Sequence, residues 1–190
     1  MQKPLFIVIA LAILVVGGFF LFNSRSYEQP SSSNSDFKNA TYVINGQPVT
    51  LAQGRASTPA APGSASMVVT QVFGNELYAD LNGDGREDVA FVLTQSSGGS
   101  GTFYYAVAAL NTPQGYVGSD AYLLGDRIAP QATTLSQNPN QKYVVVFNYA
   151  DRAPGEPMTA SPSVGKSVYV KLDQNNRWSI VEPNFSGESR

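Results

Sequence analysis

The sequence predicts a mainly β protein, with an N-terminal transmembrane helix followed by an antiparallel β meander, a sandwich or a partly closed barrel. Short apolar runs recur along the chain and are separated by Gly, Pro and Asn residues that favour turns. No stretch after residue 22 has an apolar repeat typical of a helix. The longest continuous apolar run, which carries no charge, lies at the start of the chain. Together these features favour one membrane-anchored β domain.

The first apolar run is long enough to cross a bilayer. Pro4 to Phe22 carries no charge, and at about 1.5 Å per residue a helix over this run covers about 28 Å, close to the hydrocarbon thickness. The run is long for the apolar part of a removable signal peptide, and no small-residue cleavage site follows closely. We therefore expect a single-pass anchor in the cell membrane, with the domain on the extracytoplasmic side.

The rest of the chain divides by composition. Residues 23–36 are polar and Ser-rich, as is typical of a flexible tether. Residues 52–66 are small and include prolines, which predicts a long loop or a boundary after a small N-terminal hairpin. The predicted organisation is a cytoplasmic tail (1–3), an anchor (4–22), a linker (23–36), an extracytoplasmic β domain (37–187, with 52–66 as a long loop) and a tail (188–190).

Two hairpins can be predicted from turn chemistry. Asn45-Gly46 lies between two short runs in Thr41–Leu51, and this pair suits a turn in which both central residues have positive φ. The last two runs flank Asp173–Asn176 in the same way. In the run that precedes Asp173, apolar and polar residues alternate. This places Val168, Val170 and Leu172 on the inner face.

The middle of the chain predicts central strands. Thr102–Leu110 and Lys142–Ala150 are apolar on both faces, which is typical of strands covered on both sides. In the run after the acidic loop, Val89, Phe91 and Leu93 share one face.

Composition excludes several classes of site. Cysteine and histidine are absent, which excludes disulfides, Cys/His zinc sites and imidazole bases. The net charge is −2 and basic residues are scattered, so no nucleic-acid partner is expected. Ala160–Ser167 fits a relaxed phosphate-loop pattern, but a strand-like run follows it, so no nucleotide is expected. Any metal must be a hard, oxygen-binding cation.

One acidic segment has the spacing of a calcium loop. Its oxygen donors recur at alternate positions: Asp80, Asn82, Asp84, the Arg86 carbonyl and Asp88. Gly85 lies where the chain must turn sharply between the donors. Calcium accepts a large, irregular oxygen shell, whereas magnesium requires a tighter octahedron. The spacing therefore favours calcium.

The loop departs from the helix-loop-helix pattern and resembles another group of proteins. Position twelve is Phe91 instead of a bidentate glutamate, and the flanking runs are strand-like. The segment resembles the calcium loops of FG-GAP and VCBS-type β domains and the dockerin half-motif. The resemblance covers Asp80–Asp88 and the following strand. It implies four side-chain ligands and one backbone oxygen: Asp80, Asn82, Asp84 and Asp88, with the carbonyl of Arg86.

The alternative is a polar hairpin turn, in which Asn, Asp and Gly are present only because they tolerate the backbone conformation of a turn. Charge argues against it, because five of the fourteen acids of the chain lie between residues 76 and 88. Without a cation these carboxylates would repel one another. We therefore expect calcium as the cofactor.

The chain as a whole resembles uncharacterised membrane-anchored β-domain proteins of ultra-small bacteria. The matching stretches are "DLNGDGREDVAFVLTQSSGGSGTFYYAVAALN", "GYVGSDAYLLGDRIAPQ" and "NYADRAPGEP". This family implies no established activity.

These observations predict a structural or binding module of the cell envelope, with a glycan or a protein as partner besides the membrane. No complete catalytic motif is present, and no catalytic residue is assigned. The alternative is an envelope hydrolase that uses carboxylates, drawn from the Asp126-Arg127 and Asp151-Arg152 pairs.

Overall fold

The computed structural model describes residues 36–181, which belong to the compact unit Asn34–Arg190. Within residues 36–181, no helix is long and apolar enough to cross a membrane. The predicted anchor (4–22), nearly all of the linker (23–36) and the tail (188–190) lie outside the described residues.

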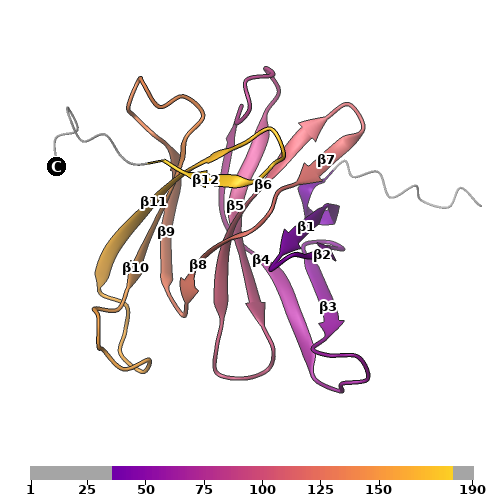
Figure 1. Ribbon diagram of the computed structural model, residues 1–190, viewed down its shortest axis with the longest axis vertical. Helices are drawn as coiled ribbons and strands as arrows, with labels where there is room; N and C mark the ends of the chain where they lie inside the picture. Colours follow the sequence, from indigo (N-terminus) through magenta and orange to yellow (C-terminus); the bar gives the residue numbers. More distant parts are fainter. Residues whose placement is uncertain (1–35, 182–190) are drawn as a thin grey trace, which may run out of the picture. The chain divides into compact units, whose positions relative to one another are not determined.

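The described residues are mainly β, as predicted. A short 3-10 helix, η1 (Phe37–Asn39), precedes β1 (Thr41–Ile44), β2 (Gln47–Thr50), β3 (Arg55–Pro59), β4 (Met67–Ala79), β5 (Asp88–Ser96), β6 (Phe103–Thr112), β7 (Gly115–Gly118), β8 (Tyr122–Asp126), β9 (Ala129–Leu135), β10 (Val145–Asp151), β11 (Val164–Leu172) and β12 (Trp178–Ile180). Figure 1 shows their arrangement.

The strands form three sheets with antiparallel pairing between neighbours. The largest sheet has the order β3-β4-β5-β6-β7, with β8 also paired to β6. The second has the order β12-β11-β10-β9, and β1 and β2 form a hairpin. Each sheet is open at its edges, so the described residues do not form a closed barrel. This arrangement is consistent with a β sandwich.

The largest sheet carries an apolar core on each face. Val89, Phe91 and Leu93 of β5 point into one core, which they share with η1 and the β1–β2 hairpin. Ala90 and Val92 point into the other core, which is shared with β10 and β11. The prediction that the first three residues share one face is confirmed, and β5 and β6 are buried on both faces.

Both predicted hairpins are present. Asn45 and Gly46 have φ of 52° and 77°. Both values are positive, as predicted for the two central residues of this turn. β11 and β12 flank the turn at residues 173–177, and Val170 and Leu172 are buried. The first hairpin is tied to the chain after β7, since Val43 N donates to Ser119 O and Ala121 N donates to Val43 O.

Gly118 allows β7 to approach this hairpin closely. A Cβ added there would lie 2.2 Å from the carbonyl oxygen of Thr41 and 2.7 Å from the ring of Tyr42. The Tyr42 ring is fully buried, and its hydroxyl donates to the Phe37 carbonyl at 2.7 Å. The absence of a side chain at Gly118 therefore permits this contact between backbones.

Two predicted boundaries were wrong. The predicted long loop 52–66 contains β3, which pairs with β4 along five residues from Arg55 to Pro59. Small residues and prolines are tolerated there because β3 is an edge strand. The predicted strand from Lys142 begins only at Val145, since Tyr143 has φ of 62° and so cannot continue an extended strand.

Candidate functional site

The acidic loop connects β4 to β5 and curls around its first carboxylate. Asp80 Oδ1 accepts hydrogen bonds from the N–H groups of Asn82 (3.2 Å) and Gly83 (2.6 Å), and Oδ2 accepts one from Gly85 (3.0 Å). Gly83 and Gly85 have φ of 89° and 81°, which glycine adopts without strain. The sharp turn expected at Gly85 is therefore present.

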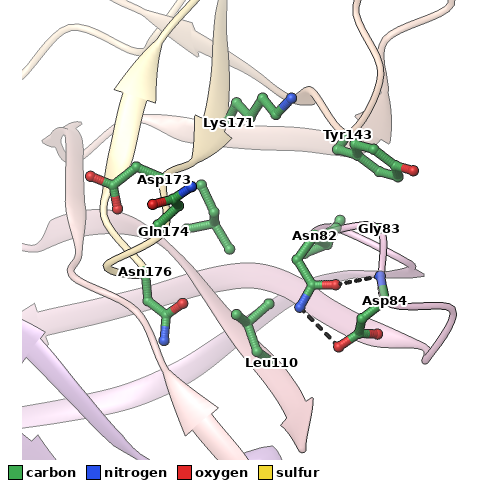
Figure 2. A pocket seen from close by; sticks show the side chains of 11 residues that line it. Asn82, Gly83, Asp84, Leu110, Tyr143, Lys171, Asp173, Gln174 and Asn176 are labelled. Atoms are coloured by element: carbon green, nitrogen blue, oxygen red, sulfur yellow. Dashed lines mark hydrogen bonds between the residues drawn. The ribbon is translucent and has the colours of Figure 1, made fainter.

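The next two donor residues are engaged with each other and with Arg86. Asn82 Oδ1 accepts from Asp84 N (2.9 Å), and Asn82 Nδ2 donates to Asp84 Oδ2 (3.1 Å), as Figure 2 shows. Asp84 Oδ1 accepts from Arg86 N (2.8 Å), while the Arg86 guanidinium donates to Asp84 Oδ2 and to the Asn111 carbonyl. The Arg86 side chain thus neutralises one predicted ligand.

Asp88 differs from the other acids because it is completely buried. Its Oδ2 accepts from Leu81 N (2.9 Å) and its Oδ1 from Asn111 N (2.8 Å). Asp88 thus joins the start of β5 to the loop after β4 and to the end of β6. Each of its oxygens retains a lone pair beyond these hydrogen bonds.

The environment moves the pKa values of two of these acids in opposite directions. Desolvation opposes ionisation of Asp80, but four backbone N–H groups of the loop hold the pKa of its carboxyl below the usual value. Burial raises the pKa of Asp88, against the effect of its two backbone hydrogen bonds, and the charges of Asp84 and Asp80 raise it further. The three carboxylates are therefore close enough to interact electrostatically.

The chemistry of the donors fits calcium, but their arrangement does not yet enclose an ion. All the predicted ligands are carboxylate, carboxamide or carbonyl oxygens, which calcium prefers. Among residues 36–181, however, no three acidic side chains form a group that could hold a metal ion as they stand. Asp84 would have to exchange its contact with Arg86 for a contact with the ion.

A pocket of about 660 Å³ lies beside the acidic loop (Figure 2). One wall is formed by Asn82, Gly83 and Asp84 of the loop. The opposite wall is formed by the end of β11 and the turn before β12, and Tyr143 closes a third side. The opposite wall consists of Lys171, Leu172, Asp173, Gln174 and Asn176, and Leu81 and Leu110 also line the pocket.

Tyr143 is held in a conformation that tyrosine seldom adopts. Its φ of 62° lies in the left-handed region, which is a clear outlier for a bulky residue. A Cβ on Gly83 would lie 3.0 Å from the Tyr143 hydroxyl, so the loop and the ring are nearly in contact. The Lys171 ammonium lies over the same ring, 5.4 Å from its centroid. Three segments thus meet at this ring.

Sequence reasoning identified only one wall of the pocket. The other wall was assigned to a hairpin turn, and Tyr143 was assigned to a strand. Gln174 and Asn176 carry no local signal beyond their preference for turns. The positive φ of Tyr143 belongs to a turn, and the sequence carries no recognisable motif for it.

Of the two Asp-Arg pairs considered for hydrolysis, only Asp126-Arg127 forms an ion pair within residues 36–181. Arg127 pairs with Asp126 at 3.1 Å. Asp151 pairs instead with Lys166 at 2.7 Å. The Arg152 guanidinium donates to the carbonyls of Ala160 and Arg127.

Comparison with protein-family models, curated proteins and solved structures gave no match. The function of the site must therefore be inferred from its own residues.

Proposed function

We propose that the chain is a membrane-anchored module of the cell envelope, whose extracytoplasmic β domain binds a partner and is stabilised by calcium at Asp80–Asp88. One observation carries the calcium part of the proposal. The loop before β5 curls around the carboxylate of Asp80 and turns at Gly85, and its predicted ligands are all hard oxygen donors. The resemblance to calcium loops of β domains supports the same view.

Calcium would supply positive charge, and the chain would supply its oxygen ligands. Asp80, Asn82, Asp84 and Asp88 would contribute side-chain oxygens, and Arg86 its carbonyl oxygen. Bound calcium would offset the mutual repulsion of the carboxylates. Since Asp88 already joins β5 to the end of β6 through Asn111, the ion would reinforce the junction of β4, β5 and β6.

The anchor and the extracytoplasmic side belong to the proposal as well. They rest on the uncharged run Pro4–Phe22 and on the short tail before it. Outside the cytoplasm, a calcium site with the weak affinity typical of extracellular modules would still be substantially occupied.

A carboxylate hydrolase is the weaker alternative. Such an enzyme needs an acid whose pKa is raised, placed beside the substrate. Asp173 lines the pocket, but hydrogen bonds from the N–H groups of Arg177 and Asn175 lower its pKa. Asp88 has a raised pKa, but it is buried and does not line the pocket. Binding therefore accounts for the site better than hydrolysis.

Calorimetry of the full chain with and without calcium tests the proposal. The missing bidentate ligand leads us to expect a dissociation constant of about 10⁻⁴ to 10⁻³ M. A tenfold excess of calcium over this constant then stabilises the fold by about 1.4 kcal/mol. That corresponds to a rise in melting temperature of about 3 to 6 °C relative to chelator.

Asp84→Ala should remove this calcium response and leave a folded domain. Glu156→Ala is the matched control, because Glu156 lies outside the acidic loop and, among residues 36–181, its carboxylate accepts a hydrogen bond only from the nearby Ala153 N–H. The control should keep the full response. Equal melting temperatures of the unmodified chain in calcium and in chelator would refute the calcium site.

A further inference from the structure

We propose that the pocket between the acidic loop and the β11–β12 turn binds a neutral, hydroxyl-rich ligand, namely a glycan. This rests on the proposed function, because it assigns a partner class to the envelope module. The volume of about 660 Å³ lies within the range of roughly 300 to 1,000 Å³ typical of small-molecule sites.

The polar side chains of the pocket have hydrogen-bonding capacity to spare. Within the described residues, the side chains of Gln174 and Asn176, the hydroxyl of Tyr143 and the ammonium of Lys171 make no hydrogen bond to protein. A carboxamide offers both donors and acceptors, as does each hydroxyl of a sugar. A carboxamide can therefore either donate a hydrogen bond to a hydroxyl or accept one from it. This suits a polyol better than an ion.

The charges around the pocket are already engaged. Asp84 is paired with Arg86, and in the proposed calcium-bound state the ion would neutralise it instead. Asp173 accepts hydrogen bonds from the N–H groups of its own turn. The ammonium of Lys171 is directed at the Tyr143 ring. No cluster of like charges remains that would select a strong anion or cation, and the ligand that fits is neutral.

The pocket also has an apolar floor. Leu81, Leu110 and Leu172 line it, and all three are at most 8% exposed. Figure 2 shows Leu110 beneath the space that separates Asn82 from Asn176. A sugar ring presents C–H groups on its faces and hydroxyls at its rim. Such a ring can cover leucine side chains while its rim meets the carboxamides.

The position of Tyr143 indicates that the pocket is built in advance. Holding a non-glycine residue in a sparsely populated backbone region costs roughly 1 to 3 kcal/mol, and such residues cluster at ligand sites. Here the unusual φ keeps the ring against Gly83, which has no side chain to obstruct it. The Tyr143 ring thus already forms a side of the pocket, beside Gly83 and under the Lys171 ammonium.

Titration calorimetry with defined oligosaccharides tests the proposal. The full chain is kept in a detergent without sugar headgroups, and the probes are cellotetraose, maltotetraose, tetra-N-acetylchitotetraose and, as a charged comparison, tetragalacturonate. We expect saturable binding of at least one neutral probe at millimolar concentration. Gln174→Ala and Asn176→Ala should each weaken this binding several-fold, as expected for loss of one or two hydrogen bonds. Gln114→Ala, in the exposed β6–β7 turn, is the matched control and should leave it unchanged.

Three results would overturn the glycan site: no saturable binding of any neutral probe, binding that both pocket variants retain in full, or binding of tetragalacturonate alone. Circular dichroism of each variant verifies that it is folded. The calcium proposal fails separately, because it depends on the melting temperature in chelator and on Asp84. A chain with no calcium response that still binds a neutral probe would refute the calcium loop and support the pocket.

Discussion

Arg86 has two opposite roles in the acidic loop. Its carbonyl oxygen is a proposed calcium ligand, whereas its guanidinium is paired with the carboxylate of Asp84 and donates to the Asn111 carbonyl. The side chain thus competes with a cation for Asp84, while the backbone assists it. The two roles can be separated by a substitution that changes only the side chain.

Arg86→Met should tighten calcium binding. Removing the guanidinium frees Asp84, and an exposed ion pair of this kind contributes about 0.2 to 1 kcal/mol, so the dissociation constant should fall by up to about fivefold. The measurement is calcium titration by calorimetry. Arg55→Met removes the same charge from β3, where Arg55 hydrogen-bonds Gln71, and should leave the affinity unchanged. Unchanged or weaker binding by Arg86→Met would contradict the competition between the guanidinium and the ion for Asp84.

At the scale of elements, β10 and β11 are joined by an ion pair as well as by their ladder. Lys166 Nζ donates to Asp151 Oδ2 at 2.7 Å across the two strands. This hydrogen bond is the main reason why the pKa of Asp151 is lowered and that of Lys166 is raised. Both shifts mean that the charged forms are more stable in the folded state than in the unfolded one.

The contribution of this pair should depend on pH in a defined window. Stability from Asp151 is present above its unfolded pKa of about 3.9 and is lost as the pH falls through its lower folded pKa. Stability from Lys166 is present below its unfolded pKa of about 10.4 and is lost as the pH rises through its higher folded value.

Lys166→Met should therefore destabilise the domain at pH 7 by about 0.2 to 1 kcal/mol, the range for exposed pairs. Denaturant unfolding at pH 7 and in acid measures the difference, which should vanish once the pH is below the folded pKa of Asp151. Lys142→Met is the control, because Lys142 forms no ion pair within the described residues. A difference that persists in acid would mean that Lys166 acts through packing of its aliphatic stem.

At the scale of the whole described unit, the largest sheet makes two cores interdependent. β5 and β6 contribute side chains to both, so neither core can separate from the other without exposing these strands. Trp178, the single tryptophan of the chain, reports on the second core: its ring packs edge-to-face on Phe147, and its N–H donates to the Ala106 carbonyl at 3.2 Å.

Phe91→Ala should consequently be detected by Trp178, although the two residues belong to different cores. Loss of a fully buried phenylalanine costs about 3 to 5 kcal/mol. The tryptophan fluorescence and far-UV circular dichroism transitions should both shift to lower denaturant and remain coincident. Phe103→Ala, at a site 41% exposed, should shift them much less. A fluorescence transition that does not move would mean that the cores unfold independently.

The sequence by itself determined the features that depend on neighbouring residues. Asn45-Gly46 predicts its turn because both residues tolerate positive φ. The double-sided apolar character of β6 predicts a central strand because burial on two faces requires it. The absence of Cys and His, with the spacing from Asp80 to Asp88, restricts any metal to an oxygen-bound one, and this candidate site remains a prediction.

Tertiary structure alone decided the features that join distant segments. β3 is a strand because β4 offers it a backbone partner, whereas its own residues resemble a loop. The buried position of Asp88 and the convergence of Tyr143 with the acidic loop and the β11–β12 turn follow from packing. The physical reason is that turn preference and apolar period act within a few residues. A pocket wall, in contrast, depends on which side chains the folded sheets bring together across the chain.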